Sequence, residues 1–399
     1  MVDLRELARE LVECPSHADE TAAGDLIERW LRAETDATVL RGEFGVLART
    51  GADAPGPGGG VDTRPALALV GHHDVVPPDA AQVRASEGTD DRPDDDGGEG
   101  SDADGAIPAD AAYVVEERDG RLYGRGSADM KGSLAAALCA FRDAADADAP
   151  VAGGHLAVVS FAGEEVGGEG CRAAIDAGFA PERAVVGEGT TGYSAPGVTD
   201  VAVAHRGRRA HTLIARGRAA HASRPEEGEN AVYRAADAVD AVRDLDAPAA
   251  TVAGETVEGS LAVTGIEGGT AWNVIPERCE VTVDERTVPG ERADVAAAVE
   301  AATAGVEPRV DQDLPPMGCG DEAFVGAGLA AARAVQDGAG ERIVKPHATD
   351  AGWLDRRAGT ECLVIGAAEP GEAHTGDESV SLSTLDRCRA IYRRLATAG

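Results

Sequence analysis

The chain contains little lysine, few aromatic residues and no long apolar segment. Lysine occurs only at Lys131 and Lys345, and aromatic residues make up 3% of the 399 residues. No apolar run approaches the length that crosses a bilayer. The N-terminal residues lack the basic segment and apolar core of a signal peptide. We therefore expect a cytoplasmic protein that does not span a membrane.

Basic residues are also scarce relative to acidic ones. The 37 lysines and arginines stand against 71 aspartates and glutamates, which gives a formal net charge of -34. Such a surface repels phosphate backbones and anionic lipids, so we expect neither nucleic-acid nor membrane partners. Because concentrated salt screens this self-repulsion, we predict a halophilic source. The seven cysteines have no paired spacing, which predicts reduced thiols rather than disulfides or a zinc ribbon.

Short apolar segments that end in a histidine or an acid are the main chemical signal. The pattern occurs three times: Leu67–Gly71 before His72, Leu156–Gly163 before Glu164 and Glu165, and Ala184–Gly187 before Glu188. Apolar runs of this length predict buried strands. In an open α/β sheet, ligands bind beyond the carboxyl ends of the strands. The repetition therefore predicts that these polar side chains form one site.

Two aspartates complete this candidate site. Asp74 follows His72 by two positions, close enough to hydrogen-bond the imidazole and fix the nitrogen that faces a metal. Asp129 precedes a predicted Ala/Leu-rich helix over 133–141, where an N-cap is the alternative interpretation. Oxygen and imidazole donors without cysteine suit zinc, manganese or cobalt. The residues alone thus predict a metal site.

The organisation of the chain changes twice. From about Val198 the pattern becomes a hairpin, a helix and further strands, which predicts a small α+β domain over 198–314. Residues 1–197 and 315–399 are predicted to form the two parts of the domain that surrounds it. An acidic, Gly-rich segment over 79–112 is predicted to be a solvated loop, because its acid spacing does not fit a calcium-binding EF-hand.

Six short motifs carry a resemblance to a known family. They are Gly71–Pro77, Gly124–Gly132, Gly163–Glu165, Gly187–Glu188, Ala220–Pro225 and Ala373–Glu378. In this order they resemble the co-catalytic zinc amidohydrolase and metallopeptidase family of acetylornithine deacetylase, succinyl-diaminopimelate desuccinylase, aminoacylase and glutamate carboxypeptidase. The resemblance covers the chain apart from the acidic segment. It implies an α/β fold with a zinc-exopeptidase-like catalytic domain and an inserted α+β dimerisation (lid) domain.

The resemblance also implies two divalent metal ions, most often zinc, with cobalt or manganese as alternatives. It implies that His72 and Glu188 bind one metal ion, that Glu165 and His374 bind the other, and that Asp129 lies between the two ions. It further implies that Asp74 orients His72 and that Glu164 is the general base. A metal pair supplies Lewis acidity and an activated water. Glu164 would take a proton from that water and deliver it to the leaving amine.

Three residues of the inserted domain match substrate-contacting positions of the family. His221 corresponds to a histidine that reaches the partner subunit's active site in a homodimer and stabilises the oxyanion. Asn273 and Arg286 match positions that contact substrate, and Arg286 could bind a carboxylate bidentately. The alternative for Arg286 is an ordinary salt bridge at the end of a strand.

The implied reaction is hydrolysis of the amide bond of an N-acyl amino acid. The segments Thr349–Leu354 and Ala373–Glu378 most resemble the acetylornithine deacetylase and desuccinylase branch. A carboxypeptidase or dipeptidase that cleaves a short peptide is the first alternative. A non-catalytic amino-acid-binding protein is the second, although a binding protein has no need of the base Glu164. Gly189 and Thr190 stand where relatives usually have proline, which leaves the specificity open.

Overall fold

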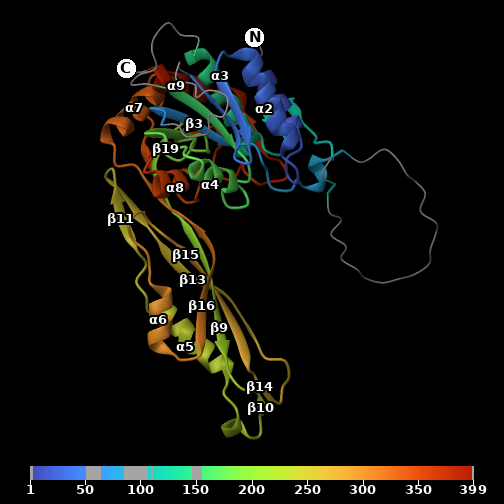
Figure 1. Ribbon diagram of the computed structural model, residues 1–399, viewed down its shortest axis with the longest axis vertical. Helices are drawn as coiled ribbons and strands as arrows, with labels where there is room; N and C mark the ends of the chain where they lie inside the picture. Colours follow the sequence, from blue (N-terminus) through green and yellow to red (C-terminus); the bar gives the residue numbers. More distant parts are fainter. Residues whose placement is uncertain (1–2, 51–63, 85–106, 109–110, 146–154, 398–399) are drawn as a thin grey trace, which may run out of the picture. The chain divides into compact units, whose positions relative to one another are not determined.

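The structure is a computed structural model of the full chain, and it describes residues 3–50, 64–84, 107–108, 111–145 and 155–397 (Figure 1). The chain divides into two compact units. Unit 1 contains residues 1–201, 326–341 and 364–399, and unit 2 contains residues 202–325 and 342–363. The division into an inserted domain over 198–314 and flanking parts of a catalytic domain stays a prediction.

Unit 1 contains a sheet that brings three of the predicted strands together. Its strands pair in the order β1–β2–β6–β3–β7. Their bounds are Thr38–Gly42 for β1, Gly45–Arg49 for β2, Leu67–His72 for β3, Leu156–Phe161 for β6 and Arg183–Val186 for β7. β3 is parallel to both β6 and β7. The carboxyl ends of these three strands therefore lie at one edge of the sheet.

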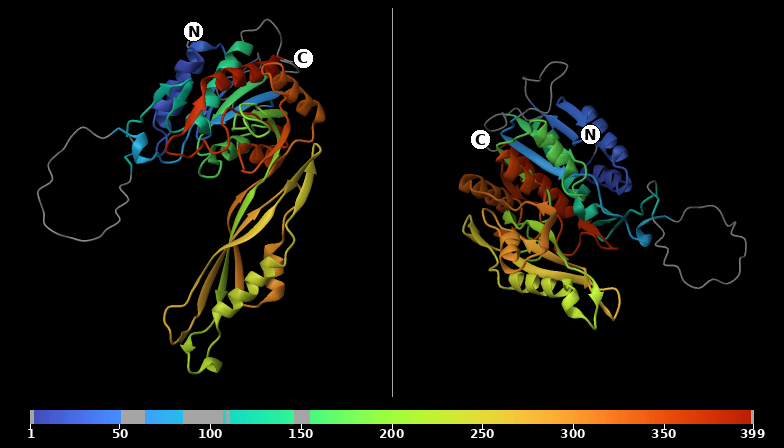
Figure 2. Two further views of the ribbon diagram at one scale, coloured as in Figure 1. Left: turned by 180° about the vertical axis from the view of Figure 1, so that it is seen from behind. Right: turned by 60° about the horizontal axis from the view of Figure 1, so that its bottom comes forward.

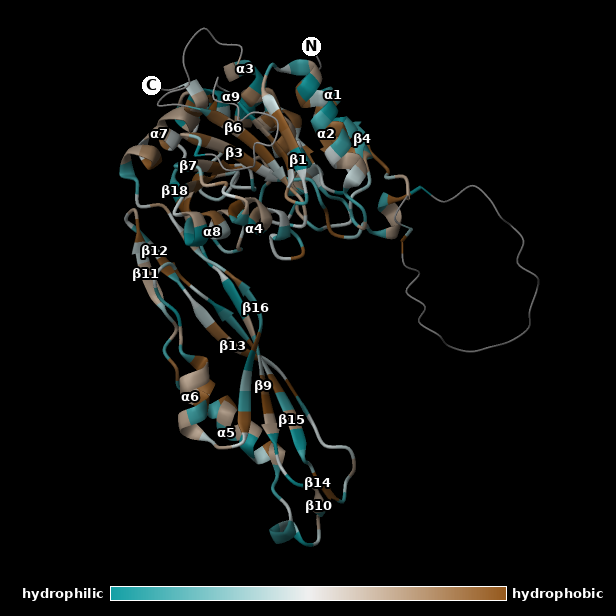
Figure 3. Cartoon of the chain, in the orientation of Figure 1, coloured by the Kyte–Doolittle hydropathy of each residue, from teal (hydrophilic) through white to brown (hydrophobic). Residues whose placement is uncertain are grey.

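Helices of unit 1 pack around this sheet. The helices are α1 (Leu4–Glu13), α2 (Thr21–Glu34), α3 (Gly132–Ala145), α4 (Glu169–Asp176) and α9 (Leu382–Thr397). Helix α3 is rich in alanine and leucine and is buried along almost its whole length, in contact with β3, β6 and α9. Figure 3 shows hydrophobic residues concentrated in the strands β3 and β6. A helix that is apolar all round is stable only when it is covered on every side.

A small antiparallel sheet and two short helical turns complete the part of unit 1 that surrounds the candidate site. The elements are β4 (Glu116–Arg118), β5 (Arg121–Tyr123), β20 (Ser379–Ser381), η1 (Ala80–Gln82) and η2 (Ser127–Lys131). The strands pair in the order β20–β5–β4. This pairing holds the segment before β20 beside the segment that leads into η2. Helix α7 spans Glu322–Arg333.

Unit 2 is built on a four-stranded antiparallel sheet in the order β13–β15–β9–β16. The strands span Ser260–Gly268 (β13), Arg278–Arg286 (β15), Arg208–Arg216 (β9) and Val306–Leu314 (β16). Buried and accessible residues alternate along β15, as expected for a sheet covered on one face. Helices α5 (Ala231–Arg243) and α6 (Val295–Ala302) pack against that face (Figure 2).

The remaining elements of unit 2 are short. They are β8 (Val201–His205), β10 (Ala220–His221), η3 (Pro225–Glu227), β11 (Ala249–Val252), β12 (Glu255–Glu258), β14 (Val274–Ile275), β17 (Met317–Gly318), β18 (Arg342–Lys345), α8 (Asp350–Trp353), η4 (Leu354–Ala358) and β19 (Glu361–Val364). Strand β8 pairs with β17, β18 and β19. The mixed content of helices and sheets confirms the predicted α/β fold class with an additional α+β part.

The predicted acidic loop over 79–112 falls largely on residues outside the described ranges. The described start of this segment, residues 79–84, is mostly exposed, but it is held in place rather than loose. Asp79 and Gln82 form a capping box around η1, and Val83 pairs with Tyr113. The Gln82 side chain is buried and donates a hydrogen bond to the Thr375 carbonyl oxygen at 3.0 Å. This contact anchors the segment, although its composition alone suggests nothing to bury.

All seven cysteines are free thiols, six of them buried, as the sequence predicted. Within the described residues, no helix has both the length and the apolarity that a membrane span requires.

Candidate metal centre

A glycine lies at the carboxyl end of each of two strands that lead to the site: Gly71 is the next-to-last residue of β3, and Gly187 directly follows β7. The same neighbouring side chain explains both glycines. A Cβ added at Gly71 or at Gly187 would lie 2.7 Å from the Cε of Met130 in η2. Only glycine lets Met130 pack this closely over both strands. The sequence pattern of an apolar strand, a glycine and a polar residue therefore reflects the packing of η2 across the strand ends.

Asp129 lies between two histidines, and each of its carboxylate oxygens faces one of them. Its Oδ1 is 3.3 Å from the Nε2 of His72, and its Oδ2 is 2.9 Å from the Nε2 of His374. His72 also contacts Glu188, with 3.2 Å between Nε2 and Oε1. His374 contacts Glu165, with 3.1 Å between Nε2 and Oε1. The structure thus pairs the histidines and glutamates as the sequence analysis paired them.

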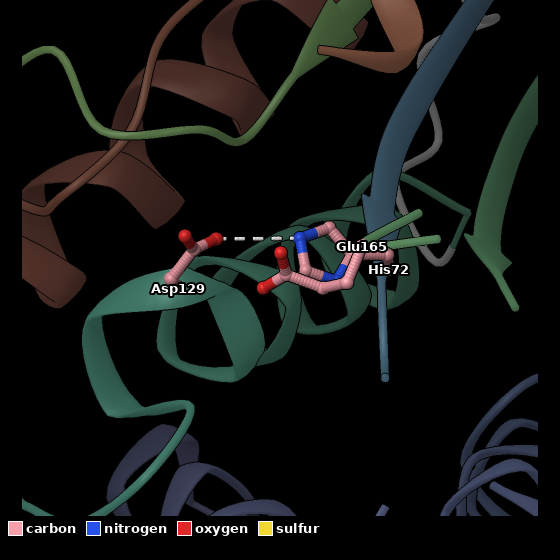
Figure 4. Close-up of side chains that lie close together, drawn as sticks. All are labelled: His72, Asp129 and Glu165. Atoms are coloured by element: carbon pink, nitrogen blue, oxygen red, sulfur yellow. Dashed lines mark ion pairs between the residues drawn. The ribbon is translucent and has the colours of Figure 1, made fainter. Parts of the chain in front are cut away.

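Ligand atoms of His72, Asp129 and Glu165 all lie within 4.8 Å of one another, which is close enough to hold a metal ion (Figure 4). The side chains come from β3, from η2 and from the turn after β6. Asp129 is not the N-cap of α3. Its backbone is non-helical (φ -122°, ψ 95°), α3 begins three residues later at Gly132, and the carboxylate faces the histidines.

Asp74 orients both His72 and the turn that carries the two adjacent glutamates. The Nδ1 of His72 lies 3.0 Å from the Asp74 carbonyl oxygen and 3.3 Å from its Oδ1. The backbone N–H of Glu165 donates to the Asp74 Oδ2 at 2.9 Å, and the N–H of Glu164 also donates to this carboxylate. These contacts leave the Nε2 of His72 facing the site. Glu164 is half-buried in the same turn.

The site concentrates negative charge in a poorly solvated place. Four carboxylates (Asp74, Asp129, Glu165 and Glu188) lie within 3.3 Å of a nitrogen of His72 or His374, and Glu164 is half-buried in the adjoining turn. The carboxylates are buried or half-buried, whereas His374 is 48% exposed. Burial and the charge of Asp129 raise the pKa of Glu165. Hydrogen bonds to Asp129 and Glu165 raise the pKa of His374 to about 10. Burial would raise the pKa of Asp129, but hydrogen bonds from His374 and His72 hold it below its usual value.

The imidazoles and the Asp129 carboxylate stabilise each other's charged forms, which raises the pKa of His374 and lowers the pKa of Asp129. Burying acids without a counter-charge is costly, so the donor set favours a positive partner. Oxygen and imidazole donors at this spacing suit a divalent transition metal.

Sequence analysis missed two residues that hold Asp129 in place. The Oε1 of Glu378 accepts hydrogen bonds from the backbone N–H of Ala128 at 3.0 Å and of Asp129 at 3.1 Å. Its Oε2 accepts a hydrogen bond from the Arg125 Nη1 at 2.6 Å, and both side chains are buried. Arg125 lies in the motif Gly124–Gly132 and Glu378 in the motif Ala373–Glu378. The sequence analysis identified both motifs but assigned no role to these two residues.

His374 has a left-handed backbone conformation, with φ 61°. Residues other than glycine rarely adopt this conformation, and such strain gathers at functional sites. The histidine is therefore held in place by its surroundings and by its contacts with Asp129 and Glu165.

Two of the three residues predicted in the inserted segment lie together in unit 2. Asn273 Nδ2 is 3.5 Å from His221 Nε2, where β10 pairs with β14. The His221 Nδ1 lies 2.8 Å from the Ser223 hydroxyl, and its ring is exposed. Arg286 instead donates to the Asp284 carboxylate from Nε at 2.7 Å. This is the strand-end salt bridge of the alternative interpretation, and it leaves the substrate role of Arg286 a prediction.

A model of peptidase family M20/M25/M40 matches residues 68–398 of the chain. Acetylornithine deacetylase of Myxococcus xanthus is 30% identical over 350 residues, which cover 84% of this chain and 81% of that protein. Succinyl-diaminopimelate desuccinylase of Granulibacter bethesdensis is 30% identical over 425 residues, which cover 99% of this chain and 97% of that protein. The chain belongs to peptidase family M20/M25/M40 and is a hydrolase of that family.

Solved structures share this fold. Aminopeptidase PepT of Bacillus cereus has a TM-score of 0.71 at 18% identity and covers 100% of this chain and 99% of its own. The YXEP protein of Bacillus subtilis, a dinuclear metal binding peptidase from M20 family, has a TM-score of 0.65 at 15% identity. It covers 99% of this chain and 96% of its own. These likenesses concern the fold.

Proposed function

We propose that the protein hydrolyses the amide bond of N-acyl amino acids, as an enzyme of the acetylornithine deacetylase and succinyl-diaminopimelate desuccinylase type. The observation that carries this proposal is Asp129, whose two oxygens face two histidines that each contact a separate glutamate. This is the arrangement expected of a carboxylate shared by two metal ions. The names of the two relatives at 30% identity support the substrate class.

The residues present fit two divalent metal ions, with zinc as the first candidate and cobalt or manganese as alternatives. We assign His72 and Glu188 to one ion, Glu165 and His374 to the other, and Asp129 to both. Two bound ions would polarise the substrate carbonyl and make a water molecule more acidic. Their four positive charges would also offset the carboxylates that otherwise draw protons onto the histidines.

The chain's own residues supply the remaining steps. Asp74 keeps the His72 Nε2 directed into the site through its contacts with Nδ1. We assign Glu164 as the general base, which removes a proton from the attacking water and passes it to the leaving amine nitrogen. Its place in the turn beside Glu165 supports this assignment, since Asp74 holds the backbone N–H groups of both residues.

We further propose that unit 2 joins two copies of the chain and that His221 serves the active site of the partner subunit. The His221 ring is exposed, and among the described residues its hydrogen-bond partners are Asn273 and Ser223 of the same unit, which supports a role outside its own chain. The His221 Nε2 would donate to the oxyanion as it forms. Mixing a Glu164→Gln copy with a His221→Ala copy should restore activity, because the mixed dimer has one intact site.

The direct test is hydrolysis of N-acetylornithine, N-succinyl-diaminopimelate and a panel of dipeptides with added zinc or cobalt. We expect metal-dependent release of the free amino acid from one acylated substrate. Glu164→Gln should lower turnover by about 100-fold or more, the range of general base catalysis, while it retains both metals. Folded protein that holds two metals and hydrolyses none of these substrates would overturn the proposal.

A carboxypeptidase or dipeptidase activity is the second candidate. It is supported by the family match, which names peptidases. Turnover of a dipeptide with no turnover of either acylated amino acid would favour this alternative.

A further inference from the structure

Beside the candidate metal centre, unit 1 holds a carboxylate to which the proposed reaction gives no role. Glu20 directly precedes α2, and its side chain is 28% exposed. Its Oε2 accepts a hydrogen bond from the Gly163 backbone N–H at 3.2 Å. Gly163 begins the turn Gly163–Glu165, which carries the proposed general base Glu164. Glu20 therefore contacts the turn that presents the base, although it lies 143 positions away in the sequence.

The Glu20 side chain does not serve the helix that it precedes. Glu20 occupies the N-cap position of α2, but its side chain forms no capping hydrogen bond with that helix. The neighbouring Asp19 instead accepts from the Thr21 N–H at 2.9 Å. Acids at the start of a helix commonly act as caps. The contact of Glu20 with Gly163 therefore needs an explanation outside α2.

Two carboxylates hold three consecutive N–H groups of the turn. Glu20 accepts from Gly163, whereas Asp74 accepts from Glu164 and Glu165. Gly163 is buried, and a buried N–H without an acceptor is costly. Because Asp74 already binds the other two N–H groups, Glu20 is the residue that fixes the start of the turn.

A buried histidine in the segment His72–Asp74 borders the same carboxylate. The Nδ1 of His73 lies 2.8 Å from the hydroxyl of Ser160 in β6, and the ring is fully buried. The His73 Nε2 has no hydrogen-bond partner among the described residues, and it lies 3.7 Å from the Glu20 Oε2. Glu20 thus lies beside both the segment that follows β3 and the turn that follows β6.

The surroundings of Glu20 disfavour its charged form. Burial and the nearby charge of Asp74 raise the pKa of Glu20 to about 7. The Gly163 N–H, His72 and Arg41 lower this pKa by smaller amounts. Carboxyl groups with perturbed pKa values cluster at functional sites. This supports the role that the contact with Gly163 indicates.

We propose that Glu20 is a positioning residue for the general base Glu164. It acts through the backbone of Gly163 and not on the substrate. The inference rests on the proposed function, because it takes Glu164 as the base. A displacement of about 1 Å at a reacting group can lower a rate by about 100-fold, so one hydrogen bond that fixes the turn can affect the rate strongly.

The test compares variants of the zinc-loaded protein on the substrate that it hydrolyses fastest. Glu20→Ala removes the acceptor and should lower kcat by about tenfold or more, with KM changed less than about twofold. Glu20→Gln keeps an amide oxygen as acceptor and should retain kcat within about threefold. Asp19→Ala is the matched control, because Asp19 contacts α2 and not the turn, and it should leave kcat unchanged.

A double variant tests whether Glu20 acts through the base. In a Glu164→Gln background, Glu20→Ala should lower kcat further by less than about twofold, because the group that it positions is already lost. A further loss of about tenfold would overturn the inference.

Hydrogen exchange measures the same contact without turnover. The peptide that contains Gly163–Glu165 should exchange about tenfold faster in Glu20→Ala and at the wild-type rate in Glu20→Gln and Asp19→Ala. If the wild-type protein hydrolyses no substrate, the proposed function fails, and this exchange alone decides whether Glu20 positions the turn.

A shorter acid keeps the test open if Glu20→Ala does not fold. Glu20→Asp keeps the charge but shortens the side chain by one methylene, and it should lower kcat by about threefold or more. Unchanged kcat and unchanged exchange in the folded Glu20→Ala or Glu20→Asp protein would overturn the inference. An equal loss of kcat in Asp19→Ala would overturn it as well.

Discussion

Single residues at the metal centre hold protons that a metal ion must displace. Hydrogen bonds to Asp129 and Glu165 raise the pKa of His374 to about 10, so this imidazole is protonated at neutral pH in the metal-free protein. Burial lowers the pKa of His72, but the nearby Asp74 carboxylate and hydrogen bonds to Asp129 and Glu188 outweigh it and raise the pKa. Metal ligation requires the neutral ring.

Metal affinity should therefore increase with pH. Below a pKa of about 10, each displaced histidine proton makes the apparent affinity about tenfold stronger per pH unit. Titration of the metal-free protein with zinc, in buffers of different ionisation enthalpy between about pH 6 and about pH 8, measures both the affinity and the protons released. An affinity independent of pH, with no proton release, would contradict this prediction.

Glu378 is the residue whose loss should most disturb the position of Asp129. Glu378→Gln leaves the buried Arg125 guanidinium without its counter-charge and weakens the hydrogen bonds to the Ala128 and Asp129 N–H groups. Breaking a buried ion pair by removing one partner costs about 3 kcal/mol. We expect the free energy of unfolding, measured by denaturant titration, to fall by about this amount, and metal affinity to fall with it.

The exposed pair of Arg118 and Glu116 provides the matched control for this prediction. Its atoms lie 3.1 Å apart and both side chains are 55% exposed. Glu116→Gln should change the stability by less than about 1 kcal/mol, because solvent screens an exposed pair. If Glu116→Gln and Glu378→Gln lowered the free energy of unfolding equally, the buried pair of Glu378 and Arg125 would contribute no more to stability than an exposed pair.

At the scale of secondary-structure elements, the site depends on how closely η2 approaches the strand ends. Gly187→Ala would place a methyl group 2.7 Å from the Cε of Met130 and 3.3 Å from the Cβ of Ser133. Met130 must then move. Because Asp129 directly precedes Met130 in the chain, its carboxylate should be displaced as well. We expect turnover to fall by about tenfold or more, with a loss of stability of about 1–3 kcal/mol from overpacking.

Two variants test this cause. Met130→Ala combined with Gly187→Ala removes the clash and should recover part of the turnover. Gly326→Ala in α7 adds a methyl group where no atom lies within 4 Å, so it should keep full activity and gain up to about 1 kcal/mol of stability. Full activity in Gly187→Ala alone would mean that the packing of η2 does not position Asp129.

Much of the site could be predicted because parallel strands align their carboxyl ends. The apolar runs before His72, Glu164 and Glu188 were enough to place β3, β6 and β7, and the structure brings the predicted ligands together at that edge. The position of Asp129 could not be predicted in this way. Its place depends on the buried pair of Glu378 and Arg125, which are far apart in the sequence and belong to no periodic pattern. The anchoring of Gln82 by Thr375 was missed for the same reason.

At the scale of the whole molecule, the sequence patterns predicted an α/β part and an α+β part. They did not predict a cavity in unit 2 that Arg209 and Asp355 line. The pattern after about Val198 predicted strands and a helix, and unit 2 contains a four-stranded sheet with α5 and α6 against one face. The cavity instead joins Arg209 at the start of β9 with Asp355 in η4, through loops whose paths no local pattern specifies. The predicted halophilic origin likewise remains a prediction from composition.

The net charge of -34 leads to a prediction for the whole chain. Like charges at this density repel one another in the folded protein more than in the expanded unfolded chain, so the repulsion lowers the free energy of unfolding. Raising the salt concentration from about 0.1 M to about 1 M shortens the Debye length from about 10 Å to about 3 Å. We therefore expect the midpoint of thermal unfolding in sodium chloride to rise over this range.

Screening must be separated from the strengthening of apolar burial that some salts cause. Sodium sulfate stabilises proteins through exclusion from their surface, whereas glycerol or sucrose acts by exclusion without screening. If charge repulsion is the cause, sodium chloride should raise the midpoint at concentrations where sucrose of equal osmolality does little. Replacing several exposed acids with glutamine should reduce the salt effect, because it removes part of the repulsion. A midpoint that falls or stays constant in sodium chloride would show that self-repulsion does not limit the stability of this fold.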